Sequence, residues 1–383
     1  MNNNTINITL ISLSLILGVY LCIIGGYGSD EDTLPMIGTF ANFLNGNFMT
    51  SRFTGYPVAE FIIGFFSYYF GSATINIVVF FSFILGCFIF FISLEKNFKK
   101  NYIFFLLLVI SNPILFFDNL EPVDYSLGFL FLSLGFYFLK SRRIELAIVF
   151  FGISIGTRIN LAPFVIIMIY FNTFNFSGGE FRKFIIIICA LFIGSLFYLT
   201  VWIHSELTLR WLTAGRPDGG IFEYGSRFLY KTLISFGIIQ TIILLIFILN
   251  KNYKKNLSKK NNFIYYLIIA NLLIFFYIPA ELSYLQPGLI FLYYLIYKYF
   301  NQKIIYILIA INFFSWIVNF ETIEIIHKNT DKCEPIVAIN AKVNPRLEKG
   351  YFYKYIDSRS KINCWIDLNS DYGKKISKGL PLK

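Results

Sequence analysis

Apolar runs of about 14 to 22 residues recur along most of the chain, and only the last sixty or so residues are predominantly polar. In lipid an α-helix satisfies all of its own backbone hydrogen-bonding groups, and runs of this length suit membrane-crossing helices. The pattern predicts an all-α fold, a polytopic transmembrane helical bundle of about eleven spans. We expect these spans at residues 8–27, 72–94, 102–117, 123–139, 144–172 (two short spans), 184–204, 228–249, 263–278, 285–299 and 304–318.

The stretch 144–172 is interpreted as two spans because of its own sequence and because of the loop that follows later. Pro163 cannot continue a helix without losing a backbone hydrogen bond. If the stretch were a single span, the five lysines of 251–260 would move to the other side of the membrane. A turn at 158–162 keeps those lysines on the side where the other basic loops lie.

Lysine and arginine concentrate on one side of the predicted bundle. With the N-terminus in the cytoplasm, the cytoplasmic loops carry fifteen basic residues and the outer loops carry five, which is a positive-inside distribution. The cytoplasmic loops are 95–101, 140–143, 173–183, 250–262 and 298–303. The outer loops are 28–71, 118–122, 156–162, 205–227 and 279–284.

The two longest polar regions both fall outside under this topology. The first outer loop contains an amphipathic stretch at 33–44 and a short apolar stretch at 58–70, which predict two helices lying on the membrane surface. The chain is expected to divide into a transmembrane domain, 1–320, and a polar non-cytoplasmic tail, 321–383. If the tail is outside, its two cysteines, Cys333 and Cys364, are expected to form a disulfide.

Composition excludes a soluble domain. Hydrophobic residues make up 56% of the 383 and charged residues 14%, against about 25% charged in an average soluble protein. The net charge of +11 follows from the basic cytoplasmic loops, so we expect membrane lipids and no nucleic acid as partners. Two histidines, His204 and His327, are too far apart in sequence to indicate a zinc site.

Three adjacent carboxylates, Asp30, Glu31 and Asp32, follow the first span directly. Mutual repulsion would make one of them hold its proton tightly, which suits a general base. Hard oxygen ligands equally suit a divalent cation, Mg or Mn, at Asp30 and Asp32. The alternative without catalysis or metal binding is an acidic turn that ends a helix at the membrane interface.

Five segments, taken together and in order, resemble the GT-C superfamily of membrane glycosyltransferases, which includes protein O-mannosyltransferases and the aminoarabinose transferase of lipid A. Glu281 departs from the pattern, because relatives often have a basic residue near that position. The five segments are Asp30-Glu31 after the first span, 52–57 (Arg-Phe-Thr-Gly-Tyr-Pro) with 65–71, 120–125 (Leu-Glu-Pro-Val-Asp-Tyr), 156–160 (Gly-Thr-Arg-Ile-Asn) and 283–287 (Ser-Tyr-Leu-Gln-Pro).

The resemblance implies transfer of a sugar from a polyprenyl-phosphate donor to a glycan, lipid or protein acceptor. The site would lie on the non-cytoplasmic face of a multi-pass protein, which we place in a bacterial inner membrane. Asp30 would act as the base, assisted by Glu31 or Asp32. The donor phosphate is assigned to Arg158, Arg52, Arg210 and Arg216, and the substrate to Tyr56, Glu121, Asp124 and Tyr284.

Arg158 is the strongest of these candidates for a functional cation, since it lies between two apolar segments. A charge at membrane depth costs at least about 2.5–3.5 kcal/mol and usually marks function. Two other functions remain open: a transporter or flippase of lipid-linked sugars, and a non-catalytic GT-C-like subunit. Against the transporter, the charges collect at one face and no inverted repeat is visible.

Overall fold

The structure, a computed structural model, describes residues 3–28, 33–46, 51, 55–95, 102–172, 179–204, 221–249, 263–279, 281–327, 338–358 and 369–383. Most of this is helical. The α-helices are α1 (Asn3–Ile24), α2 (Thr33–Leu44), α3 (Pro57–Phe70), α4 (Ser72–Leu94), α5 (Tyr102–Ser111), α6 (Pro113–Phe117), α7 (Asp124–Lys140), α8 (Ile144–Thr157), α9 (Ala162–Asn172), α10 (Gly179–Phe197), α11 (Leu199–His204), α12 (Ile221–Phe236), α13 (Ile238–Leu249), α14 (Phe263–Tyr277), α15 (Gln286–Tyr299), α16 (Gln302–Ile317), α17 (Tyr351–Ser358) and α18 (Asp371–Ser377). The 3₁₀ helices are η1 (Asp118–Leu120), η2 (Ile159–Leu161) and η6 (Leu282–Leu285), and the strands are β1 (Val318–His327) and β2 (Ala338–Lys349).

A helix occupies each predicted span, and the turn expected near residue 158 separates α8 from α9. By length and apolar composition, two described helices suffice to cross a membrane, Thr5–Ile24 and Ser72–Leu94, or up to four if each of two bent pairs counts as one span. The integral membrane class is therefore supported, whereas the count of eleven crossings is not confirmed. Several other apolar helices have only 10–17 residues.

Two of the predicted spans are broken, which the apolar pattern did not indicate. α5 and α6 meet at 88° and α12 and α13 meet at 80°. Pro113 cannot donate a backbone hydrogen bond, and Gly237 has a φ of +99°, so each break has a local cause. Asn112 serves a group at each break: its amide oxygen accepts from the Leu115 N–H at 2.9 Å, and its amide nitrogen donates to the Ser235 carbonyl at 3.1 Å.

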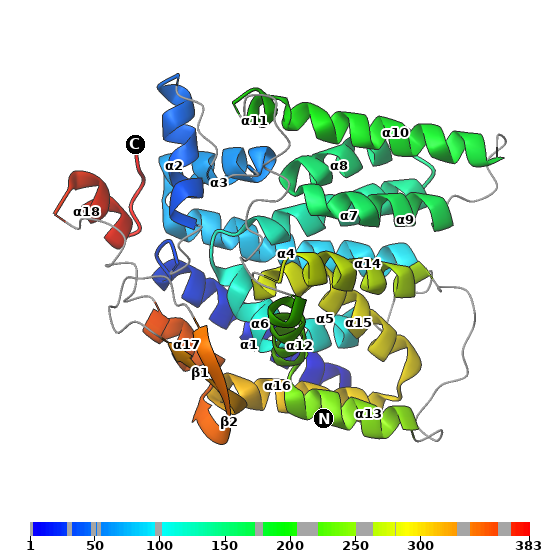
Figure 1. Cartoon of the computed structure of the whole chain (residues 1–383), viewed down its shortest axis with the longest axis vertical. Coiled ribbons are helices and arrows are strands. Elements are labelled where there is room, and N and C mark those ends of the chain that lie inside the picture. Colours follow the sequence, from blue (N-terminus) through cyan, green and yellow to red (C-terminus); the bar gives the residue numbers. More distant parts are fainter. Residues whose placement is uncertain are drawn as a thin grey trace.

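The core lies where α7 packs between α4 and α8, with α10 on the far side of α8 (Figure 1). Small residues permit this close packing. A Cβ on Gly135 of α7 would lie 2.5 Å from the Phe151 ring of α8, and one on Gly152 of α8 would lie 2.4 Å from Ile193 of α10. These contacts fix the positions of α7 and α8, and with them the two segments that supply the site.

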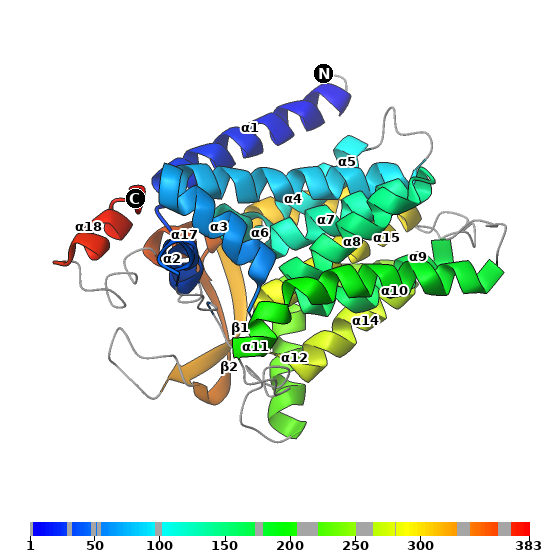
Figure 2. The ribbon, with the colours of Figure 1, turned by 90° about the horizontal axis from the view of Figure 1, so that it is seen from above.

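Both predicted surface helices of the first outer loop form, as α2 and α3, and they pack on each other. Phe40 of α2 contacts the rings of Phe61 and Phe65 of α3 edge-on, with centroids 5.4 Å apart in each case. Figure 2 shows α2 and α3 at the same end of the bundle as α17 and α18. The first loop and the last part of the chain therefore meet.

The polar tail contains an antiparallel hairpin, an addition to the expected all-α fold. β1 pairs with β2 from Val318 opposite Lys349, and its register shifts between Glu321 and Ile323. The sequence carries a signal for this: apolar residues alternate at 318 and 320, then at 323 and 325, so the alternation changes parity where the register shifts. The polar composition of this stretch by itself predicts only a tail.

Candidate functional site

Arg158 lies at the centre of the site, in the turn between α8 and η2. α8 ends at Thr157, and Arg158 takes an extended backbone conformation, φ −152° and ψ 121°. Only 1% of its surface is exposed. A guanidinium buried so completely needs compensating partners, and the neighbouring elements supply them.

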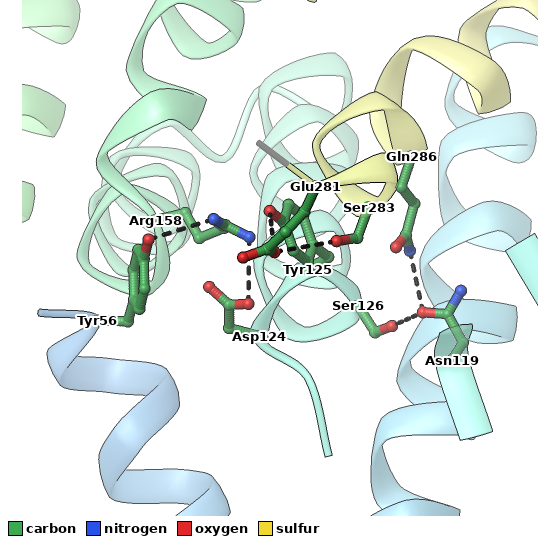
Figure 3. Close-up of polar contacts among 9 residues, drawn as sticks. All are labelled: Tyr56, Asn119, Asp124, Tyr125, Ser126, Arg158, Glu281, Ser283 and Gln286. Atoms are coloured by element: carbon green, nitrogen blue, oxygen red, sulfur yellow. Dashed lines mark hydrogen bonds and ion pairs between the residues drawn. The ribbon is translucent and has the colours of Figure 1, made fainter. Parts of the chain in front are cut away.

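The first partner of Arg158 is the Asp124 carboxylate (Figure 3). Arg158 Nη1 donates to Asp124 Oδ1 at 3.2 Å, and both side chains are 1% exposed. Asp124 is the first residue of α7, where the helix dipole favours a negative charge. Burial alone would lower the pKa of Arg158, but Asp124 and the nearby Tyr56, Tyr284 and Glu281 hold it above its usual value, so the guanidinium stays charged.

Three tyrosine rings enclose the guanidinium. Its carbon lies 3.4 Å from the Tyr125 ring centroid, 4.6 Å from that of Tyr284 and 4.8 Å from that of Tyr56. Arg158 Nη2 also donates to the Tyr56 hydroxyl at 3.3 Å. The rings come from the start of α3, from α7 and from η6, so one cation joins the first outer loop, the α8–η2 turn and the late segment.

Two atoms of this otherwise paired cluster remain unmatched. Among the described residues, Arg158 Nε and Asp124 Oδ2 are buried without a hydrogen-bond partner. An unmet buried polar group costs about 1–3 kcal/mol, more when charged. One donor and one acceptor of the same ion pair are thus left without partners, and oxygen atoms of a ligand or of water would satisfy them.

Glu281 and several neutral side chains border the Arg158 hub, by which we mean Arg158 with Asp124, Tyr56, Tyr125 and Tyr284. Glu281 Oε2 accepts from the Tyr125 hydroxyl at 3.4 Å and from Ser283 at 3.3 Å. Beside them, Gln286 Nε2 donates to Asn119 Oδ1 at 3.1 Å, and that oxygen also contacts the Ser126 hydroxyl (Figure 3). Glu281 is half-buried, so a carboxylate stands at the solvent side of the hub.

A second buried carboxylate, Glu60, belongs to the first turn of α3. It is 3% exposed and accepts from the Ser51 backbone N–H at 2.9 Å and from the Ser51 hydroxyl. Burial raises the pKa of Glu60, and the negative charge of Asp124 raises it further, which outweighs the hydrogen bonds from Ser51. Proximity to Asp124 ties α3 electrostatically to the Arg158 hub.

Glu121 lies beside the chain segment that leads into the acidic triplet. Gly28 has a φ of +83°, and a Cβ there would lie 2.5 Å from Glu121 Oε2. Glycine is therefore required at this position both for its backbone conformation and for space. Asp30 follows two residues later in the sequence, so the predicted substrate residue Glu121 borders the root of the acidic segment.

An apolar cavity of about 600 Å³ opens next to the Arg158 turn. Ile155 at the end of α8, Ile159 of η2 and Ala162 of α9 form one wall, while Leu191 and Trp202 belong to the other, from α10 and α11. Its lining is almost entirely apolar. The cavity therefore suits a hydrocarbon chain whose polar head lies toward Arg158.

The structure brings together four of the predicted residues, Tyr56, Asp124, Arg158 and Tyr284, and places Glu121 at the root of the first loop. The predicted residues that lie outside the described part of the chain are Asp30, Glu31, Asp32, Arg52, Arg210 and Arg216, together with the cysteines Cys333 and Cys364. The cation expected at Asp30 and Asp32 lies outside it as well. Among the described residues, no group of three His, Cys, Asp or Glu side chains is arranged to hold a metal ion.

Sequence reasoning missed Tyr125 and Ser283 as parts of the site and treated Glu60 as a loop carboxylate. Tyr125 adjoins Asp124, and Ser283 adjoins Tyr284, so each was inside a segment already singled out. Glu60 lay within a predicted surface helix, where an acidic residue is expected to face solvent. Its burial depends on how α3 docks on the bundle, which the sequence pattern does not show.

No protein-family model matches the sequence, and no curated protein matches it significantly. The structure is similar to the crystal structure of ArnT from Cupriavidus metallidurans bound to undecaprenyl phosphate, with a TM-score of 0.55 and 12% sequence identity. The similarity covers 77% of this chain and 60% of the ArnT chain, so this chain matches only part of that protein's length. ArnT is a GT-C aminoarabinose transferase, so the predicted resemblance is confirmed at the level of the fold: over the matched part, this chain has the fold of ArnT.

Proposed function

We propose that this protein is a membrane glycosyltransferase that takes a sugar from a polyprenyl-phosphate donor and transfers it to an acceptor on the non-cytoplasmic face. The membrane would be the bacterial inner membrane, with the N-terminus in the cytoplasm and the tail outside. The GT-C-like fold supports this class of reaction, and the ArnT structure with that fold holds undecaprenyl phosphate. Acceptors in the class are glycans, lipids or proteins.

The observation that carries the proposal is the buried Arg158–Asp124 pair with one unmatched donor and one unmatched acceptor. In the proposed complex, Arg158 Nε donates to an oxygen of the donor head group. A sugar hydroxyl donates to Asp124 Oδ2. Tyr284 is half-buried, so a shift of this ring would open the Arg158 hub to the head group.

The apolar cavity next to the Arg158 turn supplies a place for the prenyl chain. Because the prenyl chain comes from the bilayer, which is as apolar as the cavity lining, the cavity orients the chain and adds little hydrophobic free energy of its own. The head group at Arg158 and the chain in the cavity then lie on adjoining sides of Ile159. This arrangement favours a lipid-phosphate donor over a soluble sugar nucleotide.

In the proposed reaction, Asp30 removes the proton from the acceptor hydroxyl while that oxygen attacks the anomeric carbon. The bond between this carbon and the carrier phosphate breaks, and the phosphate leaves with the bonding electrons. Glu31 or Asp32 assists the base. Arg52, Arg210 and Arg216 remain candidates for stabilising the charge of the leaving phosphate. A Mg or Mn ion at Asp30 and Asp32 remains a further proposal.

The direct test measures transfer in membranes with a panel of radiolabelled polyprenyl-phosphate sugars, comparing wild type with Asp30→Asn. Wild type should transfer at least one sugar, and Asp30→Asn should lose transfer while retaining donor binding, because the shape is kept and the base is lost. Adding a chelator, then Mn, tests the metal in the same assay. Equal transfer by both proteins at equal expression would contradict the assignment of the base.

A further inference from the structure

The last residues of the sequence run along the junction between α3 and α4. The Gly379 carbonyl accepts from the Ser72 backbone N–H at 3.0 Å and from its hydroxyl at 3.1 Å. The Leu382 N–H donates to the Ser67 carbonyl at 3.3 Å, and the next residue, Lys383, donates to the Tyr68 carbonyl at 3.0 Å. These bonds satisfy the last carbonyls of α3 and the first N–H of α4, which a helix cannot pair internally.

The α3–α4 junction is one end of the first outer loop, and the same terminal segment also contacts the other end. Tyr27 follows α1, and its buried hydroxyl shares its one proton between two carbonyls, that of Leu380 at 2.8 Å and that of Ser67 at 3.2 Å. One hydroxyl therefore links the end of α1, the end of α3 and the terminal segment. Both ends of the loop 28–71 are bound by the same few residues.

α18 completes the contact by packing on α2. Ile376 is 1% exposed and belongs to the small core formed with Met36 and Ile37 of α2 and Ile63 of α3. A Cβ on Gly38 of α2 would lie 3.2 Å from the Tyr372 hydroxyl, so α18 packs closely on this face of α2. The terminal segment is thus part of the core beneath the surface helices.

We infer that residues 370–383, called the clasp here, position the first outer loop for catalysis. The acidic triplet begins three residues after Tyr27, and the other end of the loop is Gly71. Fixing both roots restricts where the triplet can lie relative to the Arg158 hub. The catalytic consequence rests on the proposed function, whereas the immobilisation of the loop does not.

Two substitutions loosen the clasp, and each has a matched control. Gly71 has a φ of +81°, and Gly71→Ala would place a Cβ 2.7 Å from the Gly379 carbonyl oxygen. Its control is Gly46→Ala, because Gly46 has a similar φ of +76° and a Cβ there would meet nothing within 4 Å. Tyr27→Phe removes the shared hydroxyl. Tyr20→Phe makes the same change on α1 at a side chain that is 56% exposed.

Amide hydrogen exchange followed by mass spectrometry measures the immobilisation in the full-length protein. Gly71→Ala and Tyr27→Phe should exchange at least about tenfold faster in peptides covering α2 and residues 369–383, as expected from losing one or two hydrogen bonds. Gly46→Ala and Tyr20→Phe should exchange as wild type does. Unchanged exchange in both clasp variants would overturn the inference.

Transfer kinetics then test the positioning role. For folded, donor-binding protein, both clasp variants should lower kcat at least about tenfold and leave KM for the donor within about twofold, since the base is displaced and the donor site is intact. Faster exchange with wild-type kcat would refute the positioning role. A wild-type protein that transfers no sugar would refute the proposed function, while the exchange data would still decide whether the clasp holds the loop.

Discussion

Replacing Arg158 with methionine removes the cation of the hub and keeps most of its apolar volume. Asp124 would then be 1% exposed with no opposite charge, and three tyrosine rings would lose their contact with the guanidinium. We expect Arg158→Met to destabilise the folded protein strongly, because a buried charge left alone is more costly than the pair itself.

The size of the effect follows from the burial of the pair. Breaking a buried ion pair from one side costs about 3–5 kcal/mol. With about 2.1 cal/mol/K of unfolding entropy per residue over 383 residues, the entropy is about 0.8 kcal/mol/K, so Tm should fall by about 4–6 °C. The double variant Arg158→Met/Asp124→Leu leaves no unpaired charge and should lose clearly less than Arg158→Met alone.

The assay is thermal unfolding of the purified protein in detergent, with Lys183→Met as the matched control. Lys183 pairs with Glu180 at 2.8 Å, but that carboxylate side is 72% exposed, and a surface pair of this kind contributes about 0–1 kcal/mol. Its loss should shift Tm by about 1 °C or less. Asp124→Leu is measured alone as well. If Arg158→Met lowers Tm no more than Lys183→Met does, or if the double variant loses the sum of what Arg158→Met and Asp124→Leu lose singly, Arg158 and Asp124 do not stabilise the fold as a pair.

Three further predictions concern pH, topology and the tail. Burial raises the pKa of Glu60 above its ordinary value of 4.5, so its contribution to stability is full below pH 4.5 and is lost as pH rises through the raised pKa. Glu60→Gln should therefore raise Tm at pH 8 and change it little at pH 4. Thermal unfolding at the two pH values measures this, and an equal shift at both would contradict it. A cysteine placed at Asn47 should be labelled by an impermeant reagent in intact cells and one at Asn256 should not; the reverse pattern would invert the topology. Cys333 and Cys364 should be bonded to each other, so alkylation without reductant should leave both unmodified, and two alkylated thiols in the native protein would refute the bond.

Much of the fold was predictable because long apolar runs are a local signal. The runs located the helices, and Pro163 with the charge distribution located the break between α8 and α9. Sharp bends within a single apolar run were not predictable. The 80° bend at Gly237 lies inside a run that is apolar on both sides, and it depends on buried partners such as Asn112, more than a hundred residues away. A hydrophobicity pattern contains no information about such partners.

The site was predictable only as a set of candidate segments. Tyr56, Asp124, Arg158 and Tyr284 each lay in a segment that resembled the GT-C family, and the structure brings them together. The sequence did not predict that Asp124 pairs with Arg158. This pairing follows from the packing of α7 against α8 in three dimensions. The clasp was also beyond the sequence pattern, since its polar terminal residues look like ordinary solvated tail until backbone hydrogen bonds to α3 and α4 are seen.

The hub and the clasp hold opposite ends of one helix, α3. Tyr56, just before α3, contacts Arg158, and the carbonyls of Ser67 and Tyr68, near its end, accept hydrogen bonds from the clasp. A surface helix held at both ends cannot slide or tilt without breaking a buried contact at one of them. Tyr27, which follows α1, is tied to the same frame, and this frame draws on residues from the beginning, the middle and the end of the sequence. Such long-range ties explain how a mostly apolar bundle of short helices can present a polar site in a defined place.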